Sequence, residues 1–510
     1  MKPQIVLAIL VLVVTLAACS ASPTPMPTPT FAPPPAPPVS TKPALPPDAP
    51  VVKPTLPPPP TKPVLAPSAT SAPIPATPAL NSKPVLHRPT NLQIGLNFIR
   101  FYWSDRPNQL DKTTPYLQPD AIFRDFKDLG VQTYRQFVQA DLFWDIVEPR
   151  DNQWNFAQAD SVIANPDFEP LVTLFRMQYA SPTPPWATSP QQFQKKMGVE
   201  ATDYVETVVK RYAPYVKYWE IGNEMAFWRA ADPGTQGSKQ AEGEEKLPAA
   251  YPLDGYSPRE QGVFLAQAAA LIRKNDPDAV IVLTGLPGLD EYGWGTWLPG
   301  VIETGGKDWF DIVNYHEYTG WERFTLMRPR FQAELKKLGL EQKPVWLTET
   351  GSSSNPKLTL RTNYPNSAET QAADVFRRIV SAWGHGDALV VWHTYITNSD
   401  TAGSWSAYGL RSERGNAQPS LYTFKLLTGE LVPLARVEKI SADARGVNAY
   451  KITTPAGAIK YVAWGTGNYT LPAGVSQMTS VIPKADGTFA WQPAQAGTAI
   501  PLSANPVLIK

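Results

Sequence analysis

Two short apolar runs that each end in a glutamate decide how this chain folds: YWEIGNE over residues 218–224, and VWLTE over residues 345–349. Short runs rich in aromatic and branched apolar residues are typical of buried β-strands. Glu224 and Glu349 therefore lie at the ends of two predicted strands. Because the carboxyl ends of the strands in a parallel barrel meet at one mouth, we expect these two side chains to face one another there.

Runs of the same kind recur between residues 91 and 428, with amphipathic helical stretches between them. We predict eight strands, at residues 92–97, 131–135, 169–175, 216–221, 280–284, 312–316, 345–349 and 388–392. One helix has a clear start signal, because Ser257, Pro258 and Glu260 supply an N-cap, a first-turn proline and a reciprocal glutamate. Eight successive βα units predict an α/β fold, a (β/α)8 TIM barrel over residues 91–428, with its active site at the strand carboxyl ends.

The character of the sequence changes after residue 428. Residues 429–510 lack the helical period and contain short apolar runs at 449–453, 459–464 and 507–510, separated by Gly, Pro and Asn turns. They predict a small C-terminal all-β, sandwich-like accessory domain. Its sequence has no cluster of aromatic residues, which favours a domain that stabilises the barrel over one that binds a ligand of its own.

Residues 1–19 predict an export signal. An apolar run at 5–16 is too short for a confident membrane-spanning helix but suits a signal peptide, and it closes with LAAC at residues 16–19. Those four residues resemble the lipobox of bacterial lipoproteins. The resemblance implies cleavage before Cys19, acylation of that residue, and a lipid anchor at the outer face of a bacterial membrane or cell surface. An ordinary signal peptide with an incidental cysteine is the alternative.

Residues 20–90 predict a disordered tether between this anchor and the barrel. Of the 56 prolines in the chain, 25 lie between residues 21 and 90, among Thr, Ala and Ser. Such a segment cannot bury enough apolar surface to fold, so we expect an extended stalk.

Composition excludes several classes of partner and cofactor. The 46 basic and 45 acidic residues nearly balance, which gives no electrostatic reason for a nucleic-acid partner. Cys19 is the one cysteine, so the mature chain forms no internal disulfide and no thiolate metal site. With four histidines a multi-histidine metal site is not expected either. We therefore expect neither a metal nor another cofactor.

Polar and aromatic residues mark the carboxyl ends of the predicted strands. They are Arg135, Asn223, Glu224, His316, Tyr318, Glu349 and Trp392. This set, in this order, resembles glycoside hydrolase clan A over residues 91–428. The local sequence is most similar to family 39 members and their relatives, with the family 5 cellulases as a second comparison.

The resemblance implies roles for the residues that match. Glu224 would be the general acid/base, and Glu349 the nucleophile of a retaining reaction. Asn223 would hold the 2-hydroxyl of the sugar at the point of cleavage. Arg135 would lie beside Glu349 and keep it ionised.

The remaining matches would form the walls of the same site. Tyr318 would donate a hydrogen bond to Glu349 or to the ring oxygen, His316 would line the wall, and Trp392 would form a hydrophobic floor under the sugar. One departure is the sequence FRM at residues 175–177, which lacks the histidine common in the cellulases. That puts a cellulase-like substrate in doubt.

The sequence therefore predicts a retaining glycoside hydrolase that cleaves a β-linked oligo- or polysaccharide. The alternative is a surface lipoprotein that binds carbohydrate without turning it over. The sugar, the linkage, endo or exo action and the oligomeric state are left open. Tryptophans in the predicted loops are candidates to stack on sugar rings, namely Trp103, Trp186, Trp228, Trp294, Trp321 and Trp405.

Overall fold

The computed structural model describes residues 91–98, 119–136, 142–163, 165–175, 198–227, 257–289, 293–357, 366–397, 407–442 and 446–510. Cys19 and the predicted tether lie outside the described residues. So do four of the candidate stacking residues, namely Trp103, Trp186, Trp228 and Trp405.

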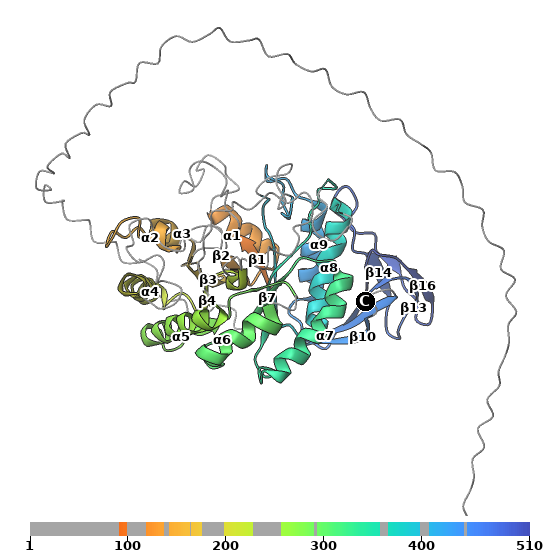
Figure 1. The fold of residues 1–510 in the computed structure, drawn as a ribbon. Helices are drawn as coiled ribbons and strands as arrows, with labels where there is room; N and C mark the ends of the chain where they lie inside the picture. The colour runs from red at the N-terminus through yellow and green to blue at the C-terminus, as the bar shows by residue number, and fades with distance from the viewer. Residues whose placement is uncertain are drawn as a thin grey trace, which may run out of the picture. The chain divides into compact units, whose positions relative to one another are not determined.

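Nine parallel strands form the central sheet (Figure 1). Their spatial order is β5-β4-β3-β2-β1-β9-β8-β7-β6. They are β1 (Ile94–Phe98), β2 (Thr133–Gln136), β3 (Glu169–Leu174), β4 (Tyr218–Ile221), β5 (Val280–Val282), β6 (Leu286–Pro287), β7 (Val313–Glu317), β8 (Val345–Thr350) and β9 (Leu389–Trp392). Each of the eight predicted strands coincides with one of them, and β6 is additional.

The sheet closes between its two ends. β5 pairs with β4 and β6 pairs with β7, so these two short segments share the place of the fifth strand. Val282 also forms an isolated parallel bridge with Ile312, next to β7. The closed ring of parallel strands confirms the predicted TIM barrel.

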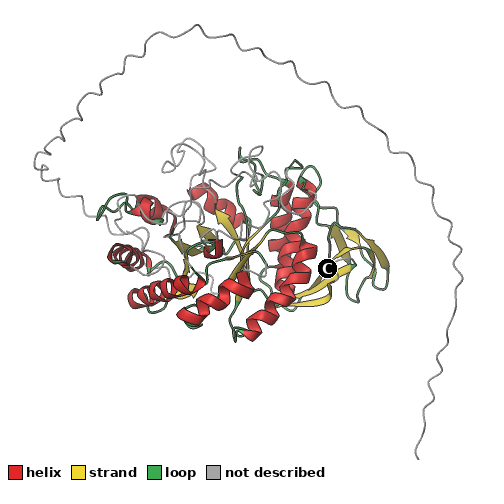
Figure 2. Cartoon of the chain, in the orientation of Figure 1, coloured by secondary structure: helices red, strands yellow, loops and turns green. Residues whose placement is uncertain are grey.

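Helices lie outside the strands (Figure 2). They are α1 (Pro119–Asp128), α2 (Trp144–Val147), α3 (Ala157–Ile163), α4 (Val199–Tyr212), α5 (Pro258–Asn275), α6 (Leu298–Gly305), α7 (Trp321–Lys337), α8 (Ala368–Gly384) and α9 (Pro419–Leu431), with the short turns η2 (Met225–Phe227) and η3 (Gly293–Trp297). α5 begins at the predicted capping box, in which Ser257 accepts from the Glu260 amide and the Glu260 side chain accepts from Ser257.

Side chains on the strands alternate between two apolar layers. Val391 belongs to the cluster inside the barrel, whereas Leu96, Tyr134 and Trp392 belong to the main core outside it. In register, Gly95 pairs with Val391, so the Gly95 side of β1 faces inward. Two residues further along the same strand, Asn97 also faces inward.

The C-terminal region is an antiparallel all-β domain, as predicted. α9 continues to Leu431, three residues past the expected boundary, and the first strand of this region begins at Arg436. One sheet has the order β10-β11-β12-β17-β14-β15, and β13 pairs with β16 separately. The strands are β10 (Arg436–Ala442), β11 (Val447–Thr453), β12 (Ile459–Gly465), β13 (Gly467–Thr470), β14 (Gln477–Ser480), β15 (Gln492–Pro493), β16 (Ala499–Leu502) and β17 (Val507–Ile509).

This β domain shares its hydrophobic core with the barrel. Trp464 is fully buried, stacks on Tyr450 at 5.3 Å between ring centroids, and meets Trp321 of α7 edge-on at 5.8 Å. Gln93, just before β1, exchanges two hydrogen bonds with the backbone of Leu434. Trp321 is therefore a contact between the two regions. It is not a face for sugar stacking, which corrects that expectation.

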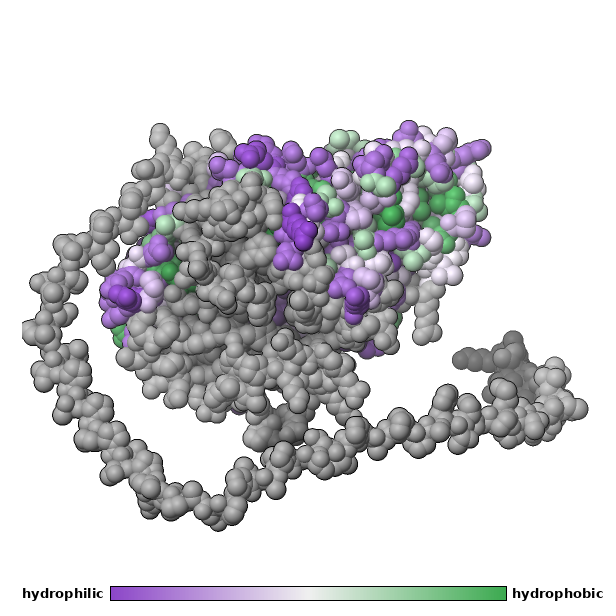
Figure 3. Space-filling view, turned by 90° about the horizontal axis from the view of Figure 1, so that it is seen from above, coloured by the Kyte–Doolittle hydropathy of each residue, from purple (hydrophilic) through white to green (hydrophobic). Residues whose placement is uncertain are grey.

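The exposed surface of the β domain gives little sign of a binding platform. Among the described residues, the exposed large hydrophobic side chains are all aliphatic. Ile440 and Ile459 lie in the β domain, and Val199 and Leu326 lie in helices of the barrel. Figure 3 shows a surface that is mostly hydrophilic on the described part of one face, with a group of apolar side chains toward its right end. Stacking on sugars uses exposed aromatic rings, so this surface agrees with a domain that stabilises the barrel.

The shared core leads to a prediction for Trp464. Replacing it with Ala empties space that both regions line, so Trp464→Ala should lower the free energy of unfolding by about 3–5 kcal/mol. Chemical denaturation followed by circular dichroism measures this change. Ile459→Ala is a matched control on the same strand, because Ile459 is 46% exposed and its loss should cost under about 1 kcal/mol. Equal effects of the two variants would contradict a shared core.

Candidate active site

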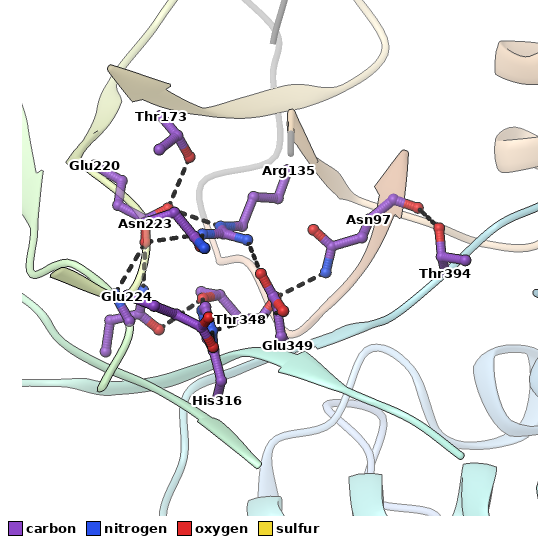
Figure 4. Close-up of polar contacts among 12 residues, drawn as sticks. Asn97, Arg135, Thr173, Glu220, Asn223, Glu224, His316, Thr348, Glu349 and Thr394 are labelled. Atoms are coloured by element: carbon purple, nitrogen blue, oxygen red, sulfur yellow. Dashed lines mark hydrogen bonds and ion pairs between the residues drawn. The ribbon is translucent and has the colours of Figure 1, made fainter. Parts of the chain in front are cut away.

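Strand carboxyl ends bring together most of the predicted polar residues. Arg135 comes from β2, Glu224 from the turn after β4, His316 and Tyr318 from β7 and the residue after it, and Glu349 from β8. Figure 4 shows the side chains of Arg135, Glu224, His316 and Glu349 converging on one another. The site occupies the mouth of the barrel where active sites of this fold lie.

The turn after β4 places Glu224 by an uncommon backbone conformation. Gly222 and Glu224 both have positive φ, 73° and 48°. A glycine adopts this region readily, whereas a glutamate there costs on the order of 1–2 kcal/mol. The Met225 amide donates to Thr284 Oγ1 at 3.3 Å, which helps hold the turn. Strain of this kind persists where the surroundings impose it, often at functional sites.

Arg135 is the centre of the buried polar network. Its Nη1 donates to Glu349 Oε1 at 2.6 Å, and its Nη2 donates to Asn223 Oδ1 at 2.6 Å. On the other side, Nε and Nη2 donate to the two oxygens of Glu220 at 2.7 and 3.0 Å. Although burial alone would lower the pKa of Arg135, the charges of Glu220 and Glu349 raise it above its ordinary value.

Glu220 is a residue of this network that the sequence interpretation missed. It lies in β4, is fully buried, and is paired with Arg135 through both oxygens. The signal was present in YWEIGNE. Tyr218 faces the inside of the barrel, so Glu220, two residues further, does too, and a carboxylate buried there requires a cationic partner.

His316 joins the two predicted catalytic carboxylates. Its Nδ1 lies 2.8 Å from Glu224 Oε1 and 3.6 Å from Glu349 Oε2, while its Nε2 lies 3.1 Å from Thr348 Oγ1. A Cβ on Gly285 would fall 2.1 Å from His316 Nε2. Glycine at position 285 is therefore what leaves room for the imidazole.

Tyr318 holds the second oxygen of Glu349. Its hydroxyl donates to Glu349 Oε2 at 2.7 Å, and its ring meets His393 and Tyr408 edge-on at 5.6 and 5.8 Å. Burial, followed by the charge of Glu349, raises the pKa of Tyr318 well above its usual value, so the hydroxyl stays a donor. His393 and Tyr408 were not predicted, because both lie in segments after β9 with no regular pattern.

The groups around Glu349 have opposite effects on its pKa. Burial raises the pKa of Glu349 above its usual value, while the charges of His316 and Arg135 and the hydrogen bond from Tyr318 act to lower it. The net direction is upward, since burial is the largest effect. Arg135 thus lies where we expected and favours the carboxylate form, but it does not outweigh the loss of water around Glu349.

Trp392 is the predicted residue that the structure does not bring to this network. It pairs in register with Leu96, and both belong to the core between strands and helices, on the outward face. The expected floor under the sugar is therefore not formed by Trp392; the ring of His393, the next residue, packs against Tyr318 instead. Trp294 is also buried, against Phe331.

Two buried amides keep one end without a hydrogen-bond partner among the described residues. Asn223 Oδ1 accepts from Arg135, and its Nδ2 has no partner. Asn97 Nδ2 donates to the Thr348 carbonyl at 2.9 Å, and its Oδ1 has no partner. Unpaired polar atoms are costly when buried, so these two offer one donor and one acceptor to a ligand.

Glu224, His316 and Glu349 each offer a ligand atom, and these atoms lie within 4.8 Å of one another. A group of this size could surround a divalent cation. The protein already supplies positive charge or a donor to Glu349, through Arg135 and Tyr318, and His316 contacts Glu224. The absence of a metal from the reaction stays a prediction.

The fold is similar to that of several solved proteins. One is a family 39 glycoside hydrolase from the gut symbiont Bacteroides cellulosilyticus WH2, with a TM-score of 0.55 and 17% identity over 83% of this chain and 81% of that one. A glucosidase from Croceicoccus marinus has a TM-score of 0.53 and 13% identity over 82% and 95%. An alpha-L-arabinofuranosidase from Thermotoga maritima has a TM-score of 0.51 and 12% identity over 84% and 98%.

No protein-family model matches the sequence, and no curated protein matches it. At identities of 12–17% the structural likeness establishes the fold. The expected resemblance to clan A is confirmed at that level.

The raised pKa of Glu349 predicts how the stability of the site depends on pH. A carboxyl group whose pKa is raised on folding destabilises the folded state above that pKa, and the cost disappears as the pH falls through it. Glu349→Gln removes the charge and should unfold at a higher temperature than the parent at pH 7. The difference should shrink toward pH 4, as scanning calorimetry measures. Glu341→Gln, at an exposed turn, is the control and should change little. A less stable Glu349→Gln at pH 7 would contradict this.

Proposed function

We propose that this chain is a retaining glycoside hydrolase that cleaves a β-linked oligo- or polysaccharide through a covalent glycosyl-enzyme intermediate. The observation that carries the proposal is the pair formed by Glu224 and Glu349. Their nearest oxygens lie within 4.8 Å at the carboxyl ends of β4 and β8, in a barrel whose solved relatives include glycoside hydrolases. The named relatives include a glucosidase and an arabinofuranosidase, so the likeness alone does not select a sugar.

The carboxylate separation supports retention of configuration. Retaining enzymes place their two carboxyl groups about 5–5.5 Å apart, whereas inverting enzymes leave about 6.5–9.5 Å for a water molecule. The nearest oxygens of Glu349 and Glu224, which lie within 4.8 Å of each other, support the shorter class. Glu349 would attack the anomeric carbon directly while Glu224 protonates the departing oxygen.

The surroundings of the two carboxylates differ in the way these two roles require. Glu349 is held by a cation and a hydroxyl, which leaves a fixed, orientated carboxylate to form the ester. Glu224 faces the imidazole of His316 at 2.8 Å, which can share a proton with it. In the second step Glu224 would take a proton from water as that water displaces the sugar from Glu349.

Hydroxyl recognition is supported by the two half-satisfied amides. Asn223 Nδ2 is a donor and Asn97 Oδ1 an acceptor, and both side chains are fully buried beside Arg135. A sugar hydroxyl both donates and accepts, so it satisfies either atom. This supports a polyhydroxylated ligand in the −1 position, next to Glu349.

For the N-terminal part we propose export and a lipid anchor at Cys19, with residues 20–90 as a tether. The support is the lipobox-like sequence LAAC at 16–19 and the proline-rich composition that follows. Among the described residues, none of the helices is long and apolar enough to cross a membrane.

Azide rescue tests the two catalytic roles. With an activated aryl glycoside, Glu224→Ala and Glu349→Ala should each lower kcat by roughly 10³-fold or more while folding normally. Azide should restore turnover in both, because it fills the space left by the missing carboxylate. Glu224→Ala should give a glycosyl azide of retained configuration, and Glu349→Ala one of inverted configuration, as NMR of the products shows. Glycosyl azides of the same configuration from both variants would contradict the assignment of the two roles. Binding of glycans without turnover by the parent chain would favour the inactive binding protein.

Fractionation tests the anchor. Full-length protein expressed in a Gram-negative bacterium should enter the detergent-soluble membrane fraction, and Cys19→Ser should move to the periplasm or medium. Labelling with a fatty-acid analogue should be lost in the same variant. Unchanged fractionation of Cys19→Ser would show that acylation does not anchor the chain.

A further inference from the structure

Glu220 accepts more hydrogen bonds than a buried carboxylate needs to replace its contacts with water. It lies at the centre of β4 with no exposed surface. It accepts twice from Arg135, and once each from Thr173 Oγ1 at 2.9 Å, the Gly285 amide at 3.2 Å and Asn314 Nδ2 at 3.0 Å. These donors come from β2, β3, β7 and the break between β5 and β6. A carboxylate bound this fully cannot rotate, so it fixes the groups that donate to it.

One consequence is the orientation of Arg135. Glu220 engages Nε and one side of Nη2, which is the side-on geometry that best matches a planar guanidinium. The opposite edge of the group then points to Glu349 through Nη1 and to Asn223 through Nη2. One cation is thereby shared between two carboxylates.

A second consequence follows a hydrogen-bond chain that begins at Glu220. A carboxylate accepts only, so the Asn314 atom facing Glu220 is Nδ2, and Asn314 Oδ1 faces away. Thr348 Oγ1 lies 2.7 Å from Asn314 Oδ1 and donates its single hydrogen there. It must then accept from His316 Nε2, at 3.1 Å. His316 carries a hydrogen on Nε2, and its Nδ1 meets Glu224 Oε1 at 2.8 Å across one shared proton.

We propose that Glu220 is a positioning residue that acts on both catalytic carboxylates at once. Through Arg135 it orients the nucleophile, Glu349. Through the chain that ends at His316 it keeps a proton available to the acid, Glu224. The inference deepens the proposed function and rests on it for the roles of the two carboxylates, while the tautomer of His316 follows from the hydrogen bonds alone.

The tautomer matters because it decides what happens when the shared proton leaves. With hydrogen fixed on Nε2, the bare Nδ1 of His316 would face a charged Glu224, which is unfavourable. The proton is therefore retained. If the hydrogen-bond chain from Glu220 were broken, His316 could carry its hydrogen on Nδ1 instead. It would then donate a hydrogen bond to the Glu224 carboxylate and stabilise it. The pair could then give up the shared proton without bringing two acceptor atoms face to face.

The groups that face these carboxylates come from several elements. Arg135 of β2, His316 of β7 and Tyr318 after it contact the carboxylates directly. Glu220 of β4 reaches Glu349 through Arg135, while His393 and Tyr408, which follow β9, pack against the ring of Tyr318. Burial, together with the charges of Arg135 and His316, lowers the pKa of His393 to about 3, so His393 is neutral at working pH. Among the described groups, the proton that the hydrogen-bond chain keeps in place is therefore the one between His316 and Glu224.

The first experiment reads the tautomer without any substrate. The chain has four histidines, so ¹⁵N-histidine labelling gives few ring signals, and His316→Gln assigns the relevant one. In the parent protein, ¹⁵N shifts should show hydrogen on Nε2 of His316. Glu220→Leu and Thr348→Val should move it to Nδ1, because Leu leaves Asn314 Nδ2 without its acceptor and Val has no hydroxyl. Thr348→Ser should restore the parent tautomer.

The second experiment measures the pH dependence of kcat/KM on an aryl glycoside. It tests both effects of Glu220, the one on Glu349 through Arg135 and the one on Glu224 through His316. Thr348→Val should shift only the basic limb, to lower pH by about 0.5–1 unit, as expected for one lost hydrogen bond. Glu220→Leu should shift both limbs to lower pH, since the hydrogen-bond chain is then broken, and Arg135 is no longer shared and favours the charged form of Glu349 more strongly. Glu169→Leu, at a buried glutamate of β3 that accepts from the Lys217 amide, is the matched control and should move neither limb.

An unchanged His316 tautomer in both Glu220→Leu and Thr348→Val would overturn the proposal, as would limbs that stay in place while activity falls. If Glu220→Leu does not fold, by circular dichroism, the variants Thr348→Val and Thr348→Ser still test the hydrogen-bond chain through Asn314. A parent chain that shows the Nε2 tautomer and its loss in the variants, but hydrolyses no glycoside, would instead refute the proposed function. The two failures are therefore distinguishable.

Discussion

The buried guanidinium of Arg135 is the contact on which the arrangement of the site depends. Two strands deliver its partners: β4 and the turn after it carry Glu220 and Asn223, and β8 carries Glu349. None of these side chains has significant exposure. A buried ion pair contributes little net stability, because removing the charges from water costs about as much as their attraction returns. Its value here is geometric. The planar fork fixes carboxylates from different strands relative to one another, which backbone hydrogen bonds alone would not do.

The interior of the barrel changes from apolar to polar along its axis, because the partners of Arg135 lie at the carboxyl ends of the strands. Toward the amino ends of the strands, apolar side chains such as Leu92, Trp346 and Leu389 fill the interior. Toward the carboxyl ends the inward positions carry Asn97, Arg135 and Glu220. The apolar layer forms a dry floor under the polar one. Water is kept from one side of the network, which strengthens the electrostatic contacts within it.

The fold and the catalytic pair could be predicted from sequence because strand ends are marked by composition. Glu224 and Glu349 follow apolar runs, and a parallel barrel brings such ends to one mouth. Glu220 was missed because it sits inside a strand, where only the alternation of faces shows that it points inward. Trp392 was misplaced for the same reason, since one residue decides between the inward and outward faces. His393 and Tyr408 lie in irregular segments after β9, where position follows from tertiary packing.

The core that the barrel shares with the β domain also sets an order of events during synthesis. The shared core includes Tyr450 and Trp464 of the β domain, and Glu430 at the end of α9 is bound by Lys460 and Lys510. A ribosome releases these groups only after the whole barrel sequence has emerged. The barrel therefore cannot complete its packing until these residues have emerged. A cut after α9 would remove the residues that cover apolar side chains of α7 and α8, such as Trp321, which meets Trp464.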